Sequence, residues 1–308
     1  MNPRIISVRP SLEPYRAYAL AAADPTRASG MLVTFFGVST LLVQDGRSGL
    51  MTDGFFTRPG LFRIMRSKIE PDAALVARSL RRVRVRSLDA VIALHSHYDH
   101  AFDSPVVAEQ TGAMLVGSES TAMIGRGYGL AEDRIAVVTP PQTMEFGAFS
   151  VTIVKSEHAP HAIYTGEIPS PVTLPAQVSD YAAGECFSIF IERAGRIVLV
   201  HASAGFVPGA FKDRRADVVY LGVGTLGKLG ADYQEDYWRE VVLATGARRV
   251  VLIHWDDFWK PLSDPLVPAP RFMDDFDTTM RFMLDRGRRD GVDIRIPEAW
   301  VAADPFAH

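Results

Sequence analysis

The sequence predicts an α/β protein, because short apolar runs alternate with segments of helical periodicity along most of the chain. Apolar runs such as Ala90–Leu94 are continuous and partly β-branched, which is typical of buried strands. Residues 71–82 instead place apolar side chains at helical spacing, after a proline that suits the first turn of a helix. The alternation continues from residue 31 to residue 296, so we expect an α/β architecture throughout.

The same patterns give the expected elements in chain order. We expect strands at residues 31–36 and 40–43, a third strand that ends at 52–54, and further strands at 90–94, 113–116, 135–138, 150–154, 217–221, 249–253 and 292–296. Residues 186–191 and 196–200 predict a hairpin across Ala194-Gly195. Helices are expected at residues 71–82, 104–110, 118–124 and 232–245, with a closing amphipathic helix at 272–284.

Length and composition favour one domain over residues 1–308. A chain of 308 residues that is 47% hydrophobic can bury a large core. No internal repeat, low-complexity tract or linker interrupts it. Residues 1 to about 30 contain four prolines and predict an irregular lead-in.

Charge and cysteine content exclude several classes of protein. A net charge of −3 gives no electrostatic basis for general nucleic-acid binding. The single cysteine, Cys186, excludes an internal disulfide framework and fits a reducing compartment. No apolar stretch reaches the roughly 20 residues that span a bilayer, and residues 17–23 are too short for a signal sequence. We therefore expect a cytoplasmic protein with a small-molecule substrate and no integral membrane association; a homo-oligomer is left open.

The segment His95-Ser96-His97-Tyr98-Asp99-His100 follows the strand expected at 90–94. Imidazole nitrogens and carboxylate oxygens are ligands that Zn²⁺ and related divalent ions accept. In extended backbone His95 and His97 point to the same side, and Asp99 and His100 follow the turn and approach the same point from another side. The motif predicts a site for two metal ions close together; the alternative is a histidine-rich surface turn that binds nothing.

The pattern H-x-H-x-D-H is that of the metallo-β-lactamase superfamily, and the chain resembles this superfamily over most of its length. The resemblance implies a four-layer αβ/βα sandwich with a metal site at one edge of two facing sheets. The opening strands and the short spacing through His158 look most like the branch that includes ascorbate-6-phosphate lactonases and N-acyl-phosphatidylethanolamine phospholipases. Val38 departs from that branch, since many of its members have histidine there.

The resemblance also implies ligands at the ends of later strands. His158 occupies the place of the third histidine of the first metal site, and His254 occupies the last ligand position. Asp53 ends the third strand near the site, where its family role is to orient a ligand. A carboxylate that forms a turn with Gly54 is the alternative for Asp53.

His161, Tyr164 and Asp256 are candidate substrate-binding residues. His161 and Tyr164 lie in an irregular stretch after His158, and such a stretch is a candidate lid over the site. His161 is equally interpretable as a loop histidine without a role. Asp256 follows His254 and is alternatively a metal ligand or a hydrogen-bond acceptor for one.

One residue departs from the family pattern in a way that bears on the second metal. Aligning the strand at 196–200 and Gly205 with the family places Ser203 where a metal-bridging aspartate usually stands. A neutral hydroxyl is a weak ligand for a hard divalent ion. His201 lies two residues earlier and faces the same side if the strand continues, so it is a candidate replacement ligand. The alternative is that His201 packs in the sheet with one hydrogen bond.

Together these features predict a metal-dependent hydrolase that uses a metal-activated hydroxide, and the resemblance to the lactonase and phospholipase branch implies a lactone, ester or phosphodiester as substrate. The expected metal is zinc, one or two per chain, with manganese or iron as alternatives. The metal lowers the pKa of bound water to about 7, and Asp99 orients the hydroxide or passes on its proton. Two ligand sets are expected: His95, His97 and His158 for the first ion, and Asp99, His100 and His254 for the second. An iron-dependent oxidoreductase and a degenerate, non-catalytic metal- or ligand-binding protein are the alternatives.

Overall fold

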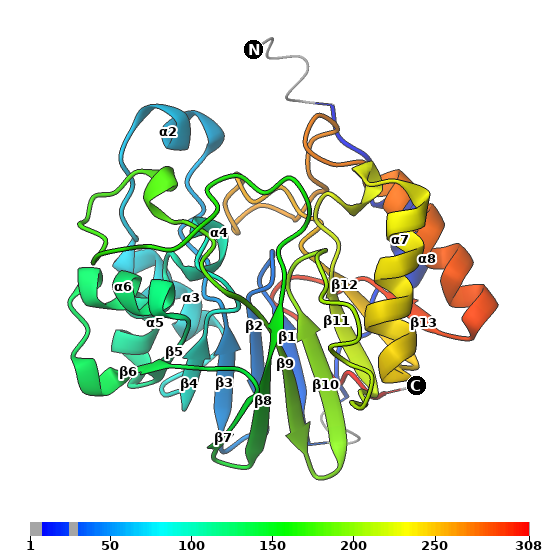
Figure 1. Cartoon of the computed structure of the whole chain (residues 1–308), viewed down its shortest axis with the longest axis horizontal. Coiled ribbons are helices and arrows are strands. Elements are labelled where there is room, and N and C mark those ends of the chain that lie inside the picture. Colours follow the sequence, from blue (N-terminus) through cyan, green and yellow to red (C-terminus); the bar gives the residue numbers. More distant parts are fainter. Residues whose placement is uncertain (1–7, 25–29, 308) are drawn as a thin grey trace.

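The structure is a computed structural model that describes residues 8–24 and 30–307. Part of the predicted lead-in, residues 1–7 and 25–29, lies outside the described residues. Within the rest of the lead-in, Glu13–Tyr18 forms a 3-10 helix, η1. The described chain otherwise forms two seven-stranded sheets with helices outside them (Figure 1). This confirms the predicted α/β class and the four-layer αβ/βα sandwich.

The first sheet has the strand order β14-β1-β2-β3-β4-β5-β6. Strands β3 to β6 run parallel to one another, so their carboxyl ends lie at the same edge. The bounds are Ala302–Ala303 (β14), Leu32–Phe35 (β1), Leu41–Gln44 (β2), Gly49–Thr52 (β3), Ala90–Ile92 (β4), Met114–Gly117 (β5) and Ile135–Val137 (β6).

The second sheet has the order β13-β12-β11-β10-β9-β8-β7. Strands β10 to β13 are parallel, and β9, β8 and β7 follow as antiparallel neighbours. The bounds are Asp293–Arg295 (β13), Arg249–Ile253 (β12), Val218–Gly222 (β11), Arg196–His201 (β10), Cys186–Arg193 (β9), Phe149–Ser156 (β8) and Gln142–Phe146 (β7). Because β8 is two antiparallel steps from β10, both strands end at the same edge.

Helices cover the outer faces of both sheets, as Figure 1 shows. On the first sheet they are α3 (Ala73–Arg82), α5 (Ser104–Thr111) and α6 (Glu119–Tyr128). On the second they are α7 (Ala231–Tyr237), its π-helical continuation η5 (Trp238–Leu243), and α8 (Phe276–Asp290). Short segments complete the helices: α2 (Leu61–Arg66), α4 (Tyr98–Ala101), η2 (Glu132–Arg134), η3 (Val178–Asp180) and η4 (Leu226–Lys228). Among the described residues, no helix combines the length and the apolar character needed to span a bilayer.

The period-2 pattern of the strands explains the layers. In β2, Leu41 and Val43 belong to the central cluster that packs the two sheets together, whereas Leu42 belongs to a second cluster beneath the outer helices. The central cluster contains Ile189 and Val198 from the facing sheet. Both sheets are therefore buried on both faces, which is the arrangement expected for strands covered by helices.

The predicted strands and helices all have counterparts, with shifted ends. The closing helix begins at Phe276 rather than at residue 272, because the Asp275 side chain accepts the Thr278 amide and caps it there. The strand predicted at 90–94 ends at Ile92. Helix α2 and the short strands β7 and β14 were not predicted. The predicted single domain stays a prediction.

Candidate metal centre

The six candidate metal ligands meet at one edge of the sandwich, because each follows a strand that ends there. His95 and His97 come after β4, and the turn helix α4 carries Asp99 and His100. The two remaining histidines lie on the other sheet, one just beyond β8 and one directly after β12: His158 and His254. Both sheets thus contribute to one site at the carboxyl ends of their parallel strands, where ligands bind in open α/β sheets.

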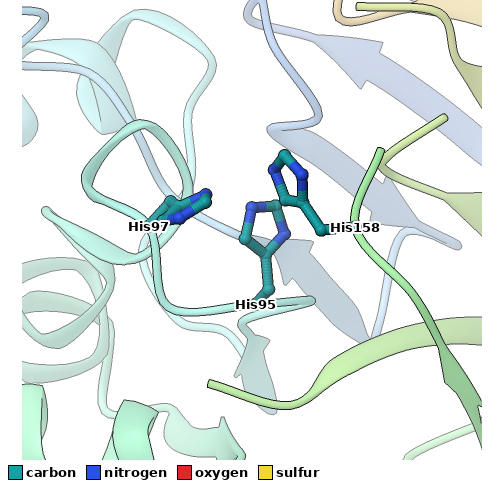
Figure 2. A group of neighbouring side chains, drawn as sticks. All are labelled: His95, His97 and His158. Atoms are coloured by element: carbon teal, nitrogen blue, oxygen red, sulfur yellow. The ribbon is translucent and has the colours of Figure 1, made fainter. Parts of the chain in front are cut away.

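The first cluster consists of His95, His97 and His158 (Figure 2). One nitrogen from each ring lies within 4.8 Å of the other two. The ring centroids are 4.9 Å apart for His95–His97, 5.0 Å for His95–His158 and 4.7 Å for His97–His158. Three imidazoles from two sheets therefore converge on a single point.

The second cluster consists of Asp99, His100 and His254, and one potential ligand atom of each lies within 4.8 Å of the other two. Nε2 of His100 lies 3.2 Å from Nε2 of His254. Asp99 Oδ2 lies 3.4 Å from His254 Nε2 and 3.7 Å from His100 Nε2. The clusters adjoin each other, since the His95 and His100 ring centroids are 3.7 Å apart.

In the first cluster, hydrogen bonds from the ring nitrogens that do not face the cluster orient two of the histidine rings. His97 Nε2 lies 3.0 Å from the Ile163 carbonyl and 3.3 Å from that of Tyr164. His158 Nδ1 lies 3.0 Å from the carbonyl of Ala159. A carbonyl accepts only N–H, so these contacts assign the proton to the outer nitrogen and leave the other nitrogen free to bind a metal.

Asp53 performs the same role for His100. Its Oδ2 accepts His100 Nδ1–H at 2.8 Å and also the Ser39 hydroxyl, while its Oδ1 accepts the Leu94 amide at 2.8 Å. The Asp53 side chain is fully buried. The carboxylate fixes the His100 tautomer and points Nε2 at the cluster, which is the contact expected of a residue that orients a ligand. The Ser39 hydroxyl, which bonds both groups, was not predicted, because a serine after a glycine turn carries no distinctive signal.

Burial determines the charge states of the first cluster. It lowers the pKa of His97 and lowers that of His158 to about 4. Burial likewise holds the pKa of His95 well below its ordinary value. These imidazoles are therefore neutral at physiological pH, the state in which histidine binds a metal.

In the second cluster, the carboxylate and the imidazoles shift each other's pKa. Burial raises the pKa of Asp99, but His100 and His254 outweigh it and hold the pKa below its ordinary value. Burial also lowers the pKa of His254, but Asp99 outweighs it and the net pKa is raised. Asp99 is therefore an ionised carboxylate beside an imidazole, with no proton blocking its oxygens.

The arrangement fits a metal on an observation independent of the motif. His95 Nε2 is buried and has no hydrogen-bond partner among the described residues. Leaving a buried polar atom unpaired is costly, and native structures rarely do so without a ligand, an ion or water. A divalent ion held by the first cluster would supply the missing partner.

His201 does not join either cluster, and its prediction as an additional ligand is wrong. Its Nδ1 lies 2.6 Å from Ser188 Oγ and its Nε2 lies 2.7 Å from the Gly205 carbonyl, so both nitrogens are engaged. Burial lowers its pKa to about 4, so the ring is neutral. His201 is a core histidine with two hydrogen bonds, where the alternative interpretation expected one.

Ser203 lies in the wall of the site, and its prediction as a metal ligand stays a prediction. Its Oγ accepts the Ala159 amide at 2.9 Å, which ties the turn after β10 to the residue that follows His158. The hydroxyl therefore positions the backbone beside a ligand in the structure.

A cavity of about 380 Å³, here called the main cavity, opens against both clusters. The structure places all three predicted substrate-binding residues, His161, Tyr164 and Asp256, in its wall. His161 and Tyr164 have positive φ angles of 65° and 54° in the loop after His158. Another part of the cavity wall, formed by Leu61, Ile64 and Met65 of α2, was not predicted. The reason is that a six-residue helix is too short to leave a periodic signal.

The Asp256 carboxylate is held by groups of this chain. Oδ1 accepts the Val38 amide at 2.7 Å, and Oδ2 pairs with the buried Arg58 guanidinium. A buried carboxylate in such a pair stabilises the loop that carries His254. Its role as an alternative metal ligand is not supported, because Asp256 is absent from both clusters of described residues.

Solved structures of other proteins share this fold. The metallo-β-lactamase fold protein YhfI from Bacillus subtilis is 18% identical, with a TM-score of 0.54 over 88% of this chain and 98% of that chain. CmlA, a diiron β-hydroxylase from Streptomyces venezuelae, is 13% identical, with a TM-score of 0.51 over 91% of this chain and 54% of its own. At these identities the similarity concerns the fold.

Sequence comparison adds relatives named for an activity. A UPF0173 metal-dependent hydrolase from Methylobacterium nodulans is 30% identical over 155 residues, which is 50% of this chain and 59% of the relative. The match to a relative of the same name from Rhizobium etli is 23% identical and covers 48% of that protein. The chain therefore spans about half the length of these curated relatives. The model of the metallo-β-lactamase superfamily matches residues 33–222, and the chain belongs to that superfamily.

Proposed function

We propose that this protein is a metal-dependent hydrolase of a lactone, ester or phosphodiester, with zinc as the expected metal. The observation that carries the proposal is the pair of adjoining ligand clusters in the wall of one cavity. The curated relatives named metal-dependent hydrolases support it.

In this proposal the first cluster holds one ion, and Asp99, His100 and His254 hold a second. Divalent ions there would lower the pKa of water to about 7 and polarise the carbonyl or phosphoryl oxygen of the substrate. Asp99 is the proposed catalytic residue: it is ionised and faces the cavity, so it can accept a hydrogen bond from the attacking water and orient it. His161 and Tyr164 are proposed to contact the substrate from the lid side.

Ser203 favours a second candidate function. Without a carboxylate at this position, nothing offsets the repulsion between two dications except Asp99. A degenerate, non-catalytic metal- or ligand-binding protein is therefore the competing proposal, and activity decides between the two. The iron-dependent oxidoreductase gains no specific support from the site.

Elemental analysis of protein purified without chelators tests the site. We expect at least one transition metal per chain in wild type and its loss in His95→Ala and in His97→Ala. His201→Ala is the matched control, because it also removes a buried imidazole and is expected to lower Tm while keeping the metal. Full metal content in both His95→Ala and His97→Ala would contradict the assignment.

Activity tests the chemistry. We expect chelator-sensitive hydrolysis of a chromogenic ester, lactone or phosphodiester, and a loss of at least ~100-fold in kcat in Asp99→Ala and in His254→Ala. Metal-loaded wild type that hydrolyses none of the three classes would instead favour the binding protein.

A further inference from the structure

The wall of the main cavity is largely apolar beyond the metal clusters. Side chains from four separated segments form it: Leu61, Ile64 and Met65 of α2; Ala162 and Ile163 of the loop after His158; Phe258 and Trp259 after β12; and Met273 before α8. Figure 1 shows α2 above the sheet edge at which the ligands lie. The volume of about 380 Å³ is near the lower end of the range in which cavities enclose small-molecule ligands.

The charged groups of this wall are acidic or histidine. No lysine or arginine is among the described residues that line the cavity, whereas Asp99, Asp256 and Asp274 are. The nearby Arg58 is fully buried and paired with Asp256, so it is not available to a substrate. A phosphodiester keeps its negative charge in the complex, and beyond the proposed metal ions the described lining offers no lysine or arginine to pair with that charge. An uncharged ester avoids that cost.

Resting on the proposed function, we infer that the substrate is an uncharged carboxylic ester or lactone with an apolar chain, and that the chain lies between α2 and Trp259. The carbonyl faces the two clusters and the chain fills the apolar end. In the reaction, the oxygen of water bonds to the acyl carbon and the bond from that carbon to the alcohol oxygen breaks. One proton of the water goes to the departing alcohol oxygen and the other leaves as the product acid ionises.

Two residues of α2 give a matched pair for a test. Met65 is 63% exposed and lines the cavity, whereas Phe62 is 57% exposed on the same helix and does not. No residue of α2 is buried, so an aspartate at either position leaves the core intact. Met65→Asp places a carboxylate beside the expected chain, and Phe62→Asp makes the same change in net charge away from it.

The first measurement is kcat/KM for p-nitrophenyl acetate, butyrate, hexanoate and octanoate, with bis(p-nitrophenyl) phosphate alongside. We expect about a fourfold rise for each methylene until the chain fills the cavity, and a slower reaction with the phosphodiester than with octanoate. Met65→Asp should lower the octanoate-to-acetate ratio of kcat/KM roughly tenfold. Met65→Leu, which keeps an apolar side chain, and Phe62→Asp should both leave this ratio close to that of wild type.

The second measurement uses metal-free protein, so it is independent of turnover. Because Trp259 lines the cavity, 2-nonanone should change the tryptophan fluorescence of wild type and of Phe62→Asp at lower concentration than that of Met65→Asp. If no substrate is hydrolysed in a chelator-sensitive way, the proposed function fails and ketone binding still decides the inference. The inference itself is overturned by a preference for the phosphodiester, by equal kcat/KM across the esters, or by equal ketone binding in Met65→Asp and wild type.

Discussion

Replacing Asp53 by asparagine should weaken the second metal cluster specifically. The carboxylate accepts the Leu94 amide at Oδ1, and His100 Nδ1–H and the Ser39 hydroxyl at Oδ2. Asparagine has one acceptor oxygen and one NH₂ group, so it cannot accept on both sides. The backbone conformation is not an obstacle, because φ is 57° at Asp53 and asparagine tolerates this region.

Both orientations of the new amide have a cost. With its oxygen toward Leu94, the NH₂ group faces His100 Nδ1, and the imidazole moves its proton to Nε2, the nitrogen that faces the cluster. With its oxygen toward His100, the NH₂ group opposes the Leu94 amide and one buried donor is unpaired, at about 1–3 kcal/mol. We expect metal affinity at the second cluster to fall about 10- to 100-fold, the range for loss of a partner that orients a ligand.

Calorimetric titration of apoprotein with zinc measures this, with Tm recorded in parallel. Asp103→Asn is the matched control: this buried carboxylate also accepts three hydrogen bonds, from Phe56 N, Thr57 N and Thr57 Oγ1, but it contacts neither cluster. The control should lower Tm without changing the affinity of either site. A folded Asp53→Asn variant that binds two zinc ions as tightly as wild type would refute the reasoning.

Two further predictions concern Ser203 and Asp274. Wild type should bind one metal firmly and a second only at higher metal concentration. Ser203→Asp should tighten the second site about tenfold, because a carboxylate can still accept the Ala159 amide and adds a negative charge between the ions. Two equally tight sites in wild-type titrations would show that the serine does not weaken the second site. Burial raises the pKa of Asp274 from the usual 3.8 to about 6, against the lowering effect of hydrogen bonds from the Asp275 and Thr225 amides. As pH rises, this carboxyl therefore ionises in the unfolded chain before it ionises in the folded protein. The free energy of unfolding should fall between about pH 4 and pH 6 for this reason. Asp274→Asn should therefore raise the free energy of unfolding by about 1–3 kcal/mol at pH 7.5 and by little at pH 4 in urea titrations of metal-free protein; an equal gain at both pH values would contradict this origin.

The apolar runs were sufficient to predict the sheets and to place candidate ligands at strand ends, whereas the assignment of His158 and His254 to ligand sets came from the resemblance to the superfamily. A buried strand produces a short apolar run, and polar side chains directly after it lie at the sheet edge. His95, His158 and His254 all follow such runs, so their convergence needed only the parallel arrangement of the strands.

Whether His201 faces the metal site depends on where strand β10 ends. The prediction that it faces the same side as Ser203 assumed that the strand continues, but β10 ends at His201 and the chain then turns. His201 instead lies opposite Ser188 in the ladder with β9, and its ring bonds that side chain. Strand ends are set by tertiary packing, and the period-2 rule does not extend beyond them.

Only part of the cavity wall was predicted, namely His161, Tyr164 and Asp256, because the other segments that form it carry no local signal. Met65, Trp259 and Met273 are separated widely in sequence and share a wall only after both sheets are assembled. The same holds for Arg58 and Asp256, a buried pair 198 positions apart. Sequence patterns report periodicity within an element, whereas these contacts depend on how distant loops pack.

The placement of the ligands links metal binding to the packing of the two sheets. His95, His97, Asp99 and His100 belong to the first sheet, and His158 and His254 to the second, so each cluster takes ligands from both. Crowding neutral imidazoles around the unpaired His95 Nε2 is unfavourable in the metal-free chain. An ion in either cluster would remove that cost and join the sheets at their shared edge, and a ligand that binds only the folded state stabilises it by mass action. The side chains that serve the proposed chemistry would therefore also stabilise the packing of the two sheets at the edge where their strands end.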